Sequence, residues 1–148
     1  MSGGAIPEGH TASLESTSYD SSKGLAHASG SNVCELEVDT STGEVKLINY
    51  SVAHDCGKKI NPLIVEGQII GGVVHGIGNA LFEEMIYDDN GQPQTTNYGE
   101  YLLPLATEMP PINIVHQETA SPLNPLGLKG AGEGGTIPAA GAIVAAIE

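Results

Sequence analysis

The feature of this sequence that most constrains its fold is a glycine-rich run near the C-terminal end, residues 126–138. The run contains five glycines, a single lysine (Lys129) and a single carboxylate (Glu133). Glycines gather where a backbone must be approached closely or where φ must be positive. We therefore expect a loop that is held through its backbone and that presents Glu133 to whatever the loop contacts.

Residue types alone leave three interpretations of this loop open. The first is a strand-to-helix turn, since glycine-rich turns before helices are common. The second is a dinucleotide-binding loop, because Gly130, Gly132 and Gly135 satisfy the pattern G-x-G-x-x-G. Glu133 disfavours that interpretation, since its carboxylate would repel a pyrophosphate. The third is a catalytic carboxylate presented on a backbone platform.

A second glycine-rich stretch, residues 62–85, has the apolar periodicity of a helix. One face carries Ile64, Ile69, Val73, Ile77 and Leu81, and the glycines inside the stretch are Gly67, Gly71, Gly72, Gly76 and Gly78. Each glycine costs a helix about 1 kcal/mol relative to alanine, so the set needs a reason. Two reasons are available, tight packing against a neighbouring element and backbone approach to a bulky cofactor. Both can hold on different faces of the helix.

The remaining pattern predicts an α+β fold. Residues 32–54 alternate as a β-hairpin around a turn at 39–44, residues 95–103 and 112–117 are predicted to be extended, and Asn90-Gly91 marks another turn. We expect the last helix to begin at Thr136, with Pro138 in its first turn. No helix-stop signal follows, which predicts a C-terminal truncation. Residues 1–24 are expected to form a loop-like N-terminal segment, ahead of a domain portion at 25–148.

The charge balance excludes two classes of partner. Lysine and arginine total 5 against 18 acidic residues, for a formal net charge of −13. A chain this acidic repels nucleic-acid phosphate and anionic membrane surfaces. No long apolar run predicts a membrane span. Cys34 and Cys56 belong to no cysteine motif, so we expect free thiols and a cytoplasmic location.

Two segments resemble one enzyme family. Residues 127–138 closely resemble the active-site glutamate segment of the molybdenum hydroxylases, the family of the xanthine oxidase, aldehyde oxidase and carbon monoxide dehydrogenase large subunits. Residues 55–78 resemble the family's Asp-Cys-Gly…Asn-Pro loop and the glycine-rich, cofactor-facing helix that follows it. Two long motifs in the same order are more specific than either alone. The resemblance covers residues 25–148, as the C-terminal portion of a molybdopterin-binding domain.

The resemblance implies a role for several residues. Glu133 would be the general base of the reaction. The residues expected to contact the cofactor are Gln68, Gly67, Gly71, Lys129 and Gly130. Molybdenum would be held through the pterin dithiolene, with no metal ligand among the side chains of this chain. His75 stands where many relatives have glutamine, so its role stays open.

The resemblance also implies a reaction and partners. The enzyme would oxidatively hydroxylate a small molecule, an aldehyde or an N-heterocycle, with water-derived oxygen, or would oxidise CO. Its cofactor would be a molybdenum-pyranopterin, in the dinucleotide form if the source is bacterial. Iron–sulfur clusters and FAD would lie on partner domains or subunits, and the chain would be inactive without the remainder of the molybdenum subunit. The alternatives are a non-catalytic binding or oligomerisation half-domain and a nucleotide-binding module.

Overall fold

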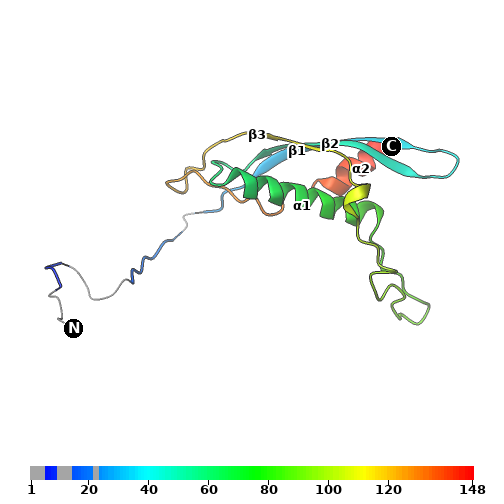
Figure 1. The fold of residues 1–148 in the computed structure, drawn as a ribbon, viewed down its shortest axis with the longest axis horizontal. Helices are drawn as coiled ribbons and strands as arrows, with labels where there is room; N and C mark the ends of the chain where they lie inside the picture. The colour runs from blue at the N-terminus through cyan, green and yellow to red at the C-terminus, as the bar shows by residue number, and fades with distance from the viewer. Residues whose placement is uncertain (1–5, 10–14, 22–23) are drawn as a thin grey trace.

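The computed structural model describes residues 6–9, 15–21 and 24–148 (Figure 1). Its regular elements are, in chain order, β1 (Ser29–Val38), β2 (Val45–Asp55), α1 (Pro62–Leu81), the short 3-10 helix η1 (Ala106–Glu108), β3 (Ile112–His116) and α2 (Ala139–Ile147). The described residues ahead of β1 form no helix or strand, and the domain boundary near residue 25 stays a prediction. No helix in the described part of the chain is long and apolar enough to cross a membrane.

Three strands form one mixed sheet in the order β1-β2-β3. β1 and β2 pair antiparallel as the predicted hairpin, and β3 pairs with β2 in parallel, which sets His116 beside His54. The hairpin turn follows from its residue types. The Asp39 carboxylate accepts a hydrogen bond from the Ser41 amide at 2.8 Å, and Gly43 has a φ of +79°. The hairpin and the third strand expected from the sequence are therefore confirmed.

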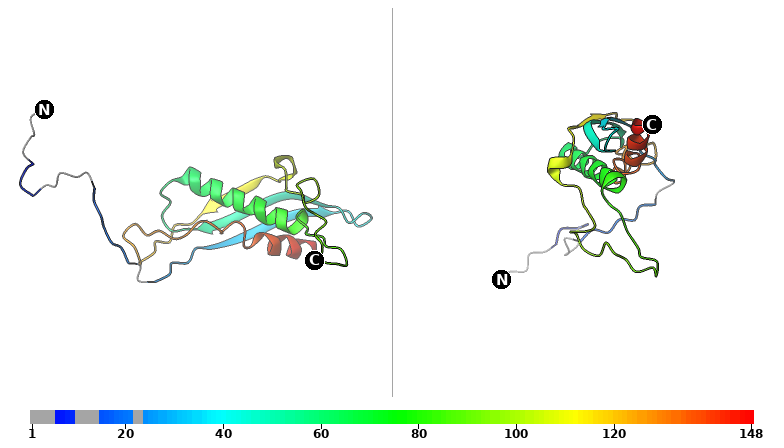
Figure 2. Two further views of the ribbon diagram at one scale, coloured as in Figure 1. Left: turned by 90° about the horizontal axis from the view of Figure 1, so that it is seen from below. Right: turned by 90° about the vertical axis from the view of Figure 1, so that its right-hand side faces the viewer.

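Both long helices cover the same face of the sheet (Figures 1 and 2). α1 begins after Asn61, whose side-chain oxygen accepts a hydrogen bond from the Ile64 amide at 3.3 Å. The apolar stripe of α1 and the short apolar run of α2 close a small core on β2. Its buried members are Tyr50, Val52, Ile69, Val73, Ile77, Ala139 and Ile143. The sheet with its two helices confirms the α+β class.

The segment after α1 departs from the sequence prediction. α1 ends at Leu81 instead of near residue 85, and the next residues form loop. No strand forms at residues 95–103. Their middle, residues 97–101, forms a turn, in which the Asn97 carbonyl accepts hydrogen bonds from the amides of Glu100 (3.1 Å) and Tyr101 (2.8 Å). The turn at Asn90-Gly91 is confirmed, and Gly91 has a φ of +79°.

The last helix also starts later than predicted. α2 begins at Ala139, and Pro138 is the residue before the helix, not a member of its first turn. Thr136 does not cap the helix. It lies in a preceding turn, where its amide donates to the Glu133 carbonyl at 3.1 Å. The backbone at 133–138 thus serves the glycine-rich loop, and the regular helix forms only after that loop has passed α1.

Candidate functional site

The two segments that carry the family resemblance lie side by side in the structure. Gly57 pairs with Leu128 in an isolated antiparallel bridge, and the Lys129 amide donates to the Cys56 carbonyl at 2.8 Å. Gly57 has a φ of +68°, and a Cβ there would overlap the Gly127 carbonyl, so only glycine fits. The start of the glycine-rich run is thereby attached to the end of β2.

Asp55, the last residue of β2, contacts both segments at this junction. Its carboxylate accepts hydrogen bonds from the amides of Gly57 (2.8 Å) and Thr119 (3.1 Å), and it lies 3.3 Å from the Lys129 ammonium. Hydrogen bonds from Thr119 and Gly57, together with Lys129, hold the pKa of Asp55 well below its usual range. The Lys129 ammonium is thus paired with Asp55 in this structure, and its contact with a cofactor stays a prediction.

The middle of the run is clamped between the sheet and α1. A Cβ on Gly134 would overlap the ring of His54 on β2, and a Cβ on Gly135 would overlap the carbonyl of Ile69 on α1. The backbone therefore passes between the two layers at a point that admits no side chain. This clamp fixes the chain immediately after Glu133.

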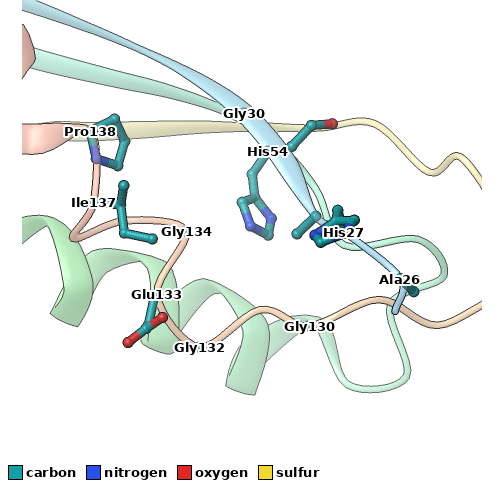
Figure 3. A pocket seen from close by; sticks show the side chains of 12 residues that line it. Ala26, His27, Gly30, His54, Gly130, Gly132, Glu133, Gly134, Ile137 and Pro138 are labelled. Atoms are coloured by element: carbon teal, nitrogen blue, oxygen red, sulfur yellow. The ribbon is translucent and has the colours of Figure 1, made fainter. Parts of the chain in front are cut away.

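Glu133 is held by its main chain and lines an open cleft (Figure 3). Its carbonyl accepts hydrogen bonds from the amides of Thr136 (3.1 Å) and Ile137 (3.2 Å), while its side chain is exposed. The carboxylate points away from the ring of His54. The cleft has a volume of about 490 Å³ and is lined by Ala26, His27, Ala28, Ser29, Gly30, His54, Gly130, Gly132, Glu133, Gly134, Ile137 and Pro138. Only Glu133 among these lining residues is a carboxylate, and none is a lysine or an arginine.

The glycines of α1 divide according to the face they occupy. Gly72, Gly76 and Gly78 face neighbours: a Cβ on Gly76 would overlap α2, and a Cβ on Gly72 would lie 3.1 Å from the loop backbone. A Cβ on Gly67 or Gly71 would meet no described atom within 4 Å. Packing therefore accounts for the first three glycines and leaves the other two without a structural reason in the part of the chain described.

Gln68 and His75 share this open side of α1 with Gly67 and Gly71, and all four residues are exposed. The structure thus divides the predicted site into two groups. Glu133 and Gly130 line the cleft, whereas Gln68, Gly67 and Gly71 lie on the open side of the helix. Within the described residues, no group of three or more His, Cys, Asp or Glu side chains is arranged to hold a metal ion.

The sequence reasoning missed His54. This residue is only 2% exposed, and it continues the inward-facing row of Tyr50 and Val52 along β2 to the cleft. Burial lowers the pKa of its imidazole, His116 lowers it further, and Asp55 opposes the shift. The available signal was the period-2 alternation, which places His54 on the buried face of the predicted strand.

Comparison with known proteins matches this architecture to one family. A family model of the molybdopterin cofactor-binding domain matches residues 7–110. The γ subunit of the 6-hydroxypseudooxynicotine dehydrogenase complex of Paenarthrobacter nicotinovorans is 46% identical over 120 residues, which are 80% of this chain and 15% of that protein. The nicotine 6-hydroxylase large subunit of the same organism is 42% identical over 142 residues, which are 95% of this chain and 17% of that protein.

Solved structures agree with the sequence matches. The crystal structure of quinoline 2-oxidoreductase from Pseudomonas putida 86 superposes with a TM-score of 0.78 at 48% identity, over 81% of this chain and 15% of that chain. The Cu,Mo-CO dehydrogenase structure superposes with the same TM-score of 0.78 at 32% identity. The present chain therefore spans only about one sixth of the length of the curated relatives it matches, 15–17%.

Proposed function

The chain belongs to the molybdenum hydroxylases, as part of their molybdenum-binding subunit, and on this basis we propose that it supplies the general base and part of the cofactor surface of an oxidoreductase. The reaction is the hydroxylation of an aldehyde or an N-heterocycle with water-derived oxygen, or the oxidation of CO. The observation that supports this proposal is the placement of Glu133. Its carboxylate is exposed at a cleft, while the following two glycines are clamped between β2 and α1.

The open side of α1 fits a pyranopterin. Gly67 and Gly71 carry no side chain although no described neighbour requires this, and each weakens the helix by about 1 kcal/mol relative to alanine. An occupant from outside the described residues explains both. The exposed amide of Gln68 lies beside them and offers a donor and an acceptor, which suits the polar edge of a pterin. We assign Gln68, Gly67 and Gly71 to this surface.

The chemistry divides between the cofactor and the chain. When bound, the molybdenum cofactor supplies the oxygen transfer and takes up the electrons of the substrate. Glu133 accepts a proton at its carboxylate oxygen. General-base catalysis of this kind contributes about 10²- to 10⁴-fold to the reaction rate. No lysine or arginine lines the cleft to compete for that carboxylate, since Lys129 is paired with Asp55. The main-chain hydrogen bonds at the Glu133 carbonyl keep the loop in one geometry.

The partners follow from the surface of the chain. Large apolar side chains are exposed along both helices and beside the loop, among them Leu63 (79%), Ile64 (66%) and Ile137 (74%). An exposed surface of this kind marks an interface. We propose that the remainder of the molybdenum subunit covers it, and that iron–sulfur clusters and FAD lie on further domains or subunits. A cytoplasmic location would keep the free thiols of Cys34 and Cys56 reduced.

The test is Glu133→Gln in the purified enzyme that contains this chain. We expect turnover to fall by about 10²- to 10⁴-fold, with the molybdenum and pterin content unchanged. Glu84→Gln is the matched control, because Glu84 is also exposed but lies outside the cleft. Near-normal turnover of the Glu133 variant in a fully loaded enzyme would refute the assignment.

The same preparation tests the alternatives. A symmetric, metal-free oligomer of this chain would support the oligomerisation half-domain, since the exposed apolar surface would then be covered by a second copy. The nucleotide-binding module is disfavoured by the loop itself. Glu133 is the only carboxylate among the residues that line the cleft, no lysine or arginine lines it, and a carboxylate there would repel a pyrophosphate.

A further inference from the structure

The imidazole of His54 is buried without a hydrogen-bond partner. Both of its ring nitrogens are inaccessible to solvent, and neither is bonded to any residue in the described part of the chain. Buried polar atoms in proteins almost always have a partner, so an orphaned imidazole beside a functional loop requires an explanation. His54 also lines both the cleft at Glu133 and a smaller adjoining cleft, together with Ser29 and Gly30 of β1.

The ring lies directly against the glycine-rich loop. A Cβ on Gly134 would overlap its Nε2 atom, so the loop backbone rests on the imidazole edge. Gly30 of β1 pairs with His54, and a Cβ on Gly30 would overlap the Ala53 carbonyl, so no side chain fits at this position beside His54. Figure 3 shows the imidazole between the strand and the loop, on the side of Gly134, the residue that follows Glu133 in the chain.

We propose that His54 is a positioning residue for Glu133, which acts through its contact with Gly134 and does so only while its ring is uncharged. The catalytic consequence rests on the proposed role of Glu133. The seating of the loop does not, because it follows from the contact alone.

The requirement that the His54 ring be uncharged follows from the number of N–H groups on the imidazole. A protonated imidazole carries an N–H group at each nitrogen, whereas the described surroundings offer no acceptor to either one. Protonation therefore requires the loop to lift and admit water. We expect the ring to stay neutral while the loop is closed, and to gain a proton when the loop opens.

Several titratable groups face this ring. On β3, His116 lowers the pKa of His54, and Glu66 of α1 lies 3.7 Å from the His116 ring. On β2, Asp55 acts in the opposite direction, and burial has the largest effect of all. His27 and Glu133 lie across the cleft. Since the closed-state pKa of His54 is lowered, the closed loop is fully favoured above the ordinary histidine pKa of 6.5 and loses this advantage as the pH falls below it.

Hydrogen exchange at the loop tests the proposal without any activity measurement. The amides of Thr136 and Ile137 bond to the Glu133 carbonyl, so their protection reports on loop closure. In the full chain we expect this protection to fall as the pH drops below 6.5, by at most about tenfold per pH unit after correction for intrinsic exchange, because opening takes up one proton. His54→Phe keeps a ring of similar size without nitrogens and should abolish this pH dependence.

His27→Phe is the matched control, since His27 lines the same cleft but is exposed. It should retain the pH dependence of the wild type. Protection that is independent of pH in the wild type would overturn the proposal, as would an unchanged dependence in His54→Phe. If His54→Phe does not fold, the imidazole ¹⁵N signals of His54 in the wild type decide. They must titrate in step with the loss of protection, and a loss without titration overturns the proposal.

Kinetics of the loaded enzyme test the catalytic consequence. His54→Ala should lower kcat much more than it changes KM, because a displaced Glu133 loses its alignment and not its ligand contacts. His54→Phe should restore most of kcat by supporting Gly134 again. An unchanged kcat in a fully loaded His54→Ala enzyme would overturn the positioning role. If Glu133 itself proves dispensable, the Glu133→Gln experiment fails, whereas the exchange measurement still decides whether His54 seats the loop.

Discussion

Substitutions at two glycines of α1 distinguish the two reasons for glycine in this helix, which are tight packing against a neighbour and close approach of a cofactor. Gly76→Ala would bring a Cβ into overlap with Ala139 and to 2.9 Å from the Thr136 carbonyl. Overpacking of this kind costs about 3 kcal/mol at the upper end of its range, and the gain of about 1 kcal/mol in helix propensity offsets part of it. We expect a net loss of about 2 kcal/mol. Gly71→Ala meets no described atom within 4 Å and should gain about 1 kcal/mol.

The two variants should therefore differ by about 3 kcal/mol in unfolding free energy, which corresponds to a separation of about 6–12 °C in Tm for a domain of this size. Urea unfolding followed by circular dichroism measures the difference directly, provided that the slope of the transition is unchanged. A Gly71→Ala variant that is destabilised as strongly as Gly76→Ala would refute the division of the glycines by face. A neutral Gly76→Ala variant would refute the packing at α2.

Gly71→Ala also predicts an effect on the cofactor content of the enzyme. In the complete enzyme, Gly71→Ala should reduce the molybdenum and pterin content, because its methyl group would project into the surface assigned to the pterin. Gly141→Ala is the matched control, since Gly141 is an exposed glycine of α2 whose Cβ would also meet nothing within 4 Å. It should stabilise the protein by a similar amount and leave the cofactor content unchanged. Equal and full occupancy in both variants would contradict the assignment.

Three further predictions concern buried polar groups and the clamp. Asp55→Asn should lower Tm at neutral pH, because it leaves Lys129 without its charged partner. The Tm difference from the wild type should shrink as the pH falls below 3.8, the ordinary pKa of aspartate, because the lowered pKa of Asp55 contributes stability that is lost in this direction. Tyr50→Phe should be as stable as the wild type or more so, because the Tyr50 hydroxyl has no described partner. Burial raises the pKa of Tyr50 to about 12, so in alkaline melts the variant should lose less stability than the wild type as the pH rises above 10. Gly134→Ala should cost less stability in a His54→Ala background than in the wild type, with a coupling of about 0.5–3 kcal/mol in chemical unfolding; additive effects would contradict the contact.

The sequence predicted the elements whose signals are local. The alternation around residues 39–44 predicted the hairpin, and the apolar period of residues 62–85 predicted α1, because both patterns are set by which side chains are buried. The end of α1 and the start of α2 were misplaced, since they depend on contacts made elsewhere. Thr136 has the residue type of a helix cap, yet its amide bonds to Glu133 and the chain at this point packs on Gly72.

The candidate site was predictable in part. The resemblance predicts roles for Glu133 and Gln68, and these roles stay predictions. It could not show that the Lys129 ammonium pairs with Asp55, because the two residues are brought together by the bridge between Gly57 and Leu128. His54 was missed for a different reason. The alternation along the strand indicates that His54 faces inward, but it does not indicate what the ring contacts, and only the approach of Gly134 makes His54 part of the site.

The two walls of the clamp differ in kind, and this difference decides how Glu133 can move. Gly135 rests on main-chain atoms of α1, the Ile69 carbonyl and the Val73 amide, which the helix hydrogen bonds hold in place. Gly134 rests on the ring of His54, a side chain that can rotate. The contact between the loop and the helix is therefore fixed, whereas the contact between the loop and the sheet can change when the His54 side chain rotates. The surface assigned to the pterin lies on the open side of the same helix. Because α1 contacts the loop that carries Glu133 and also carries the proposed pterin surface, this chain alone would set the separation between the proposed base and the proposed cofactor surface.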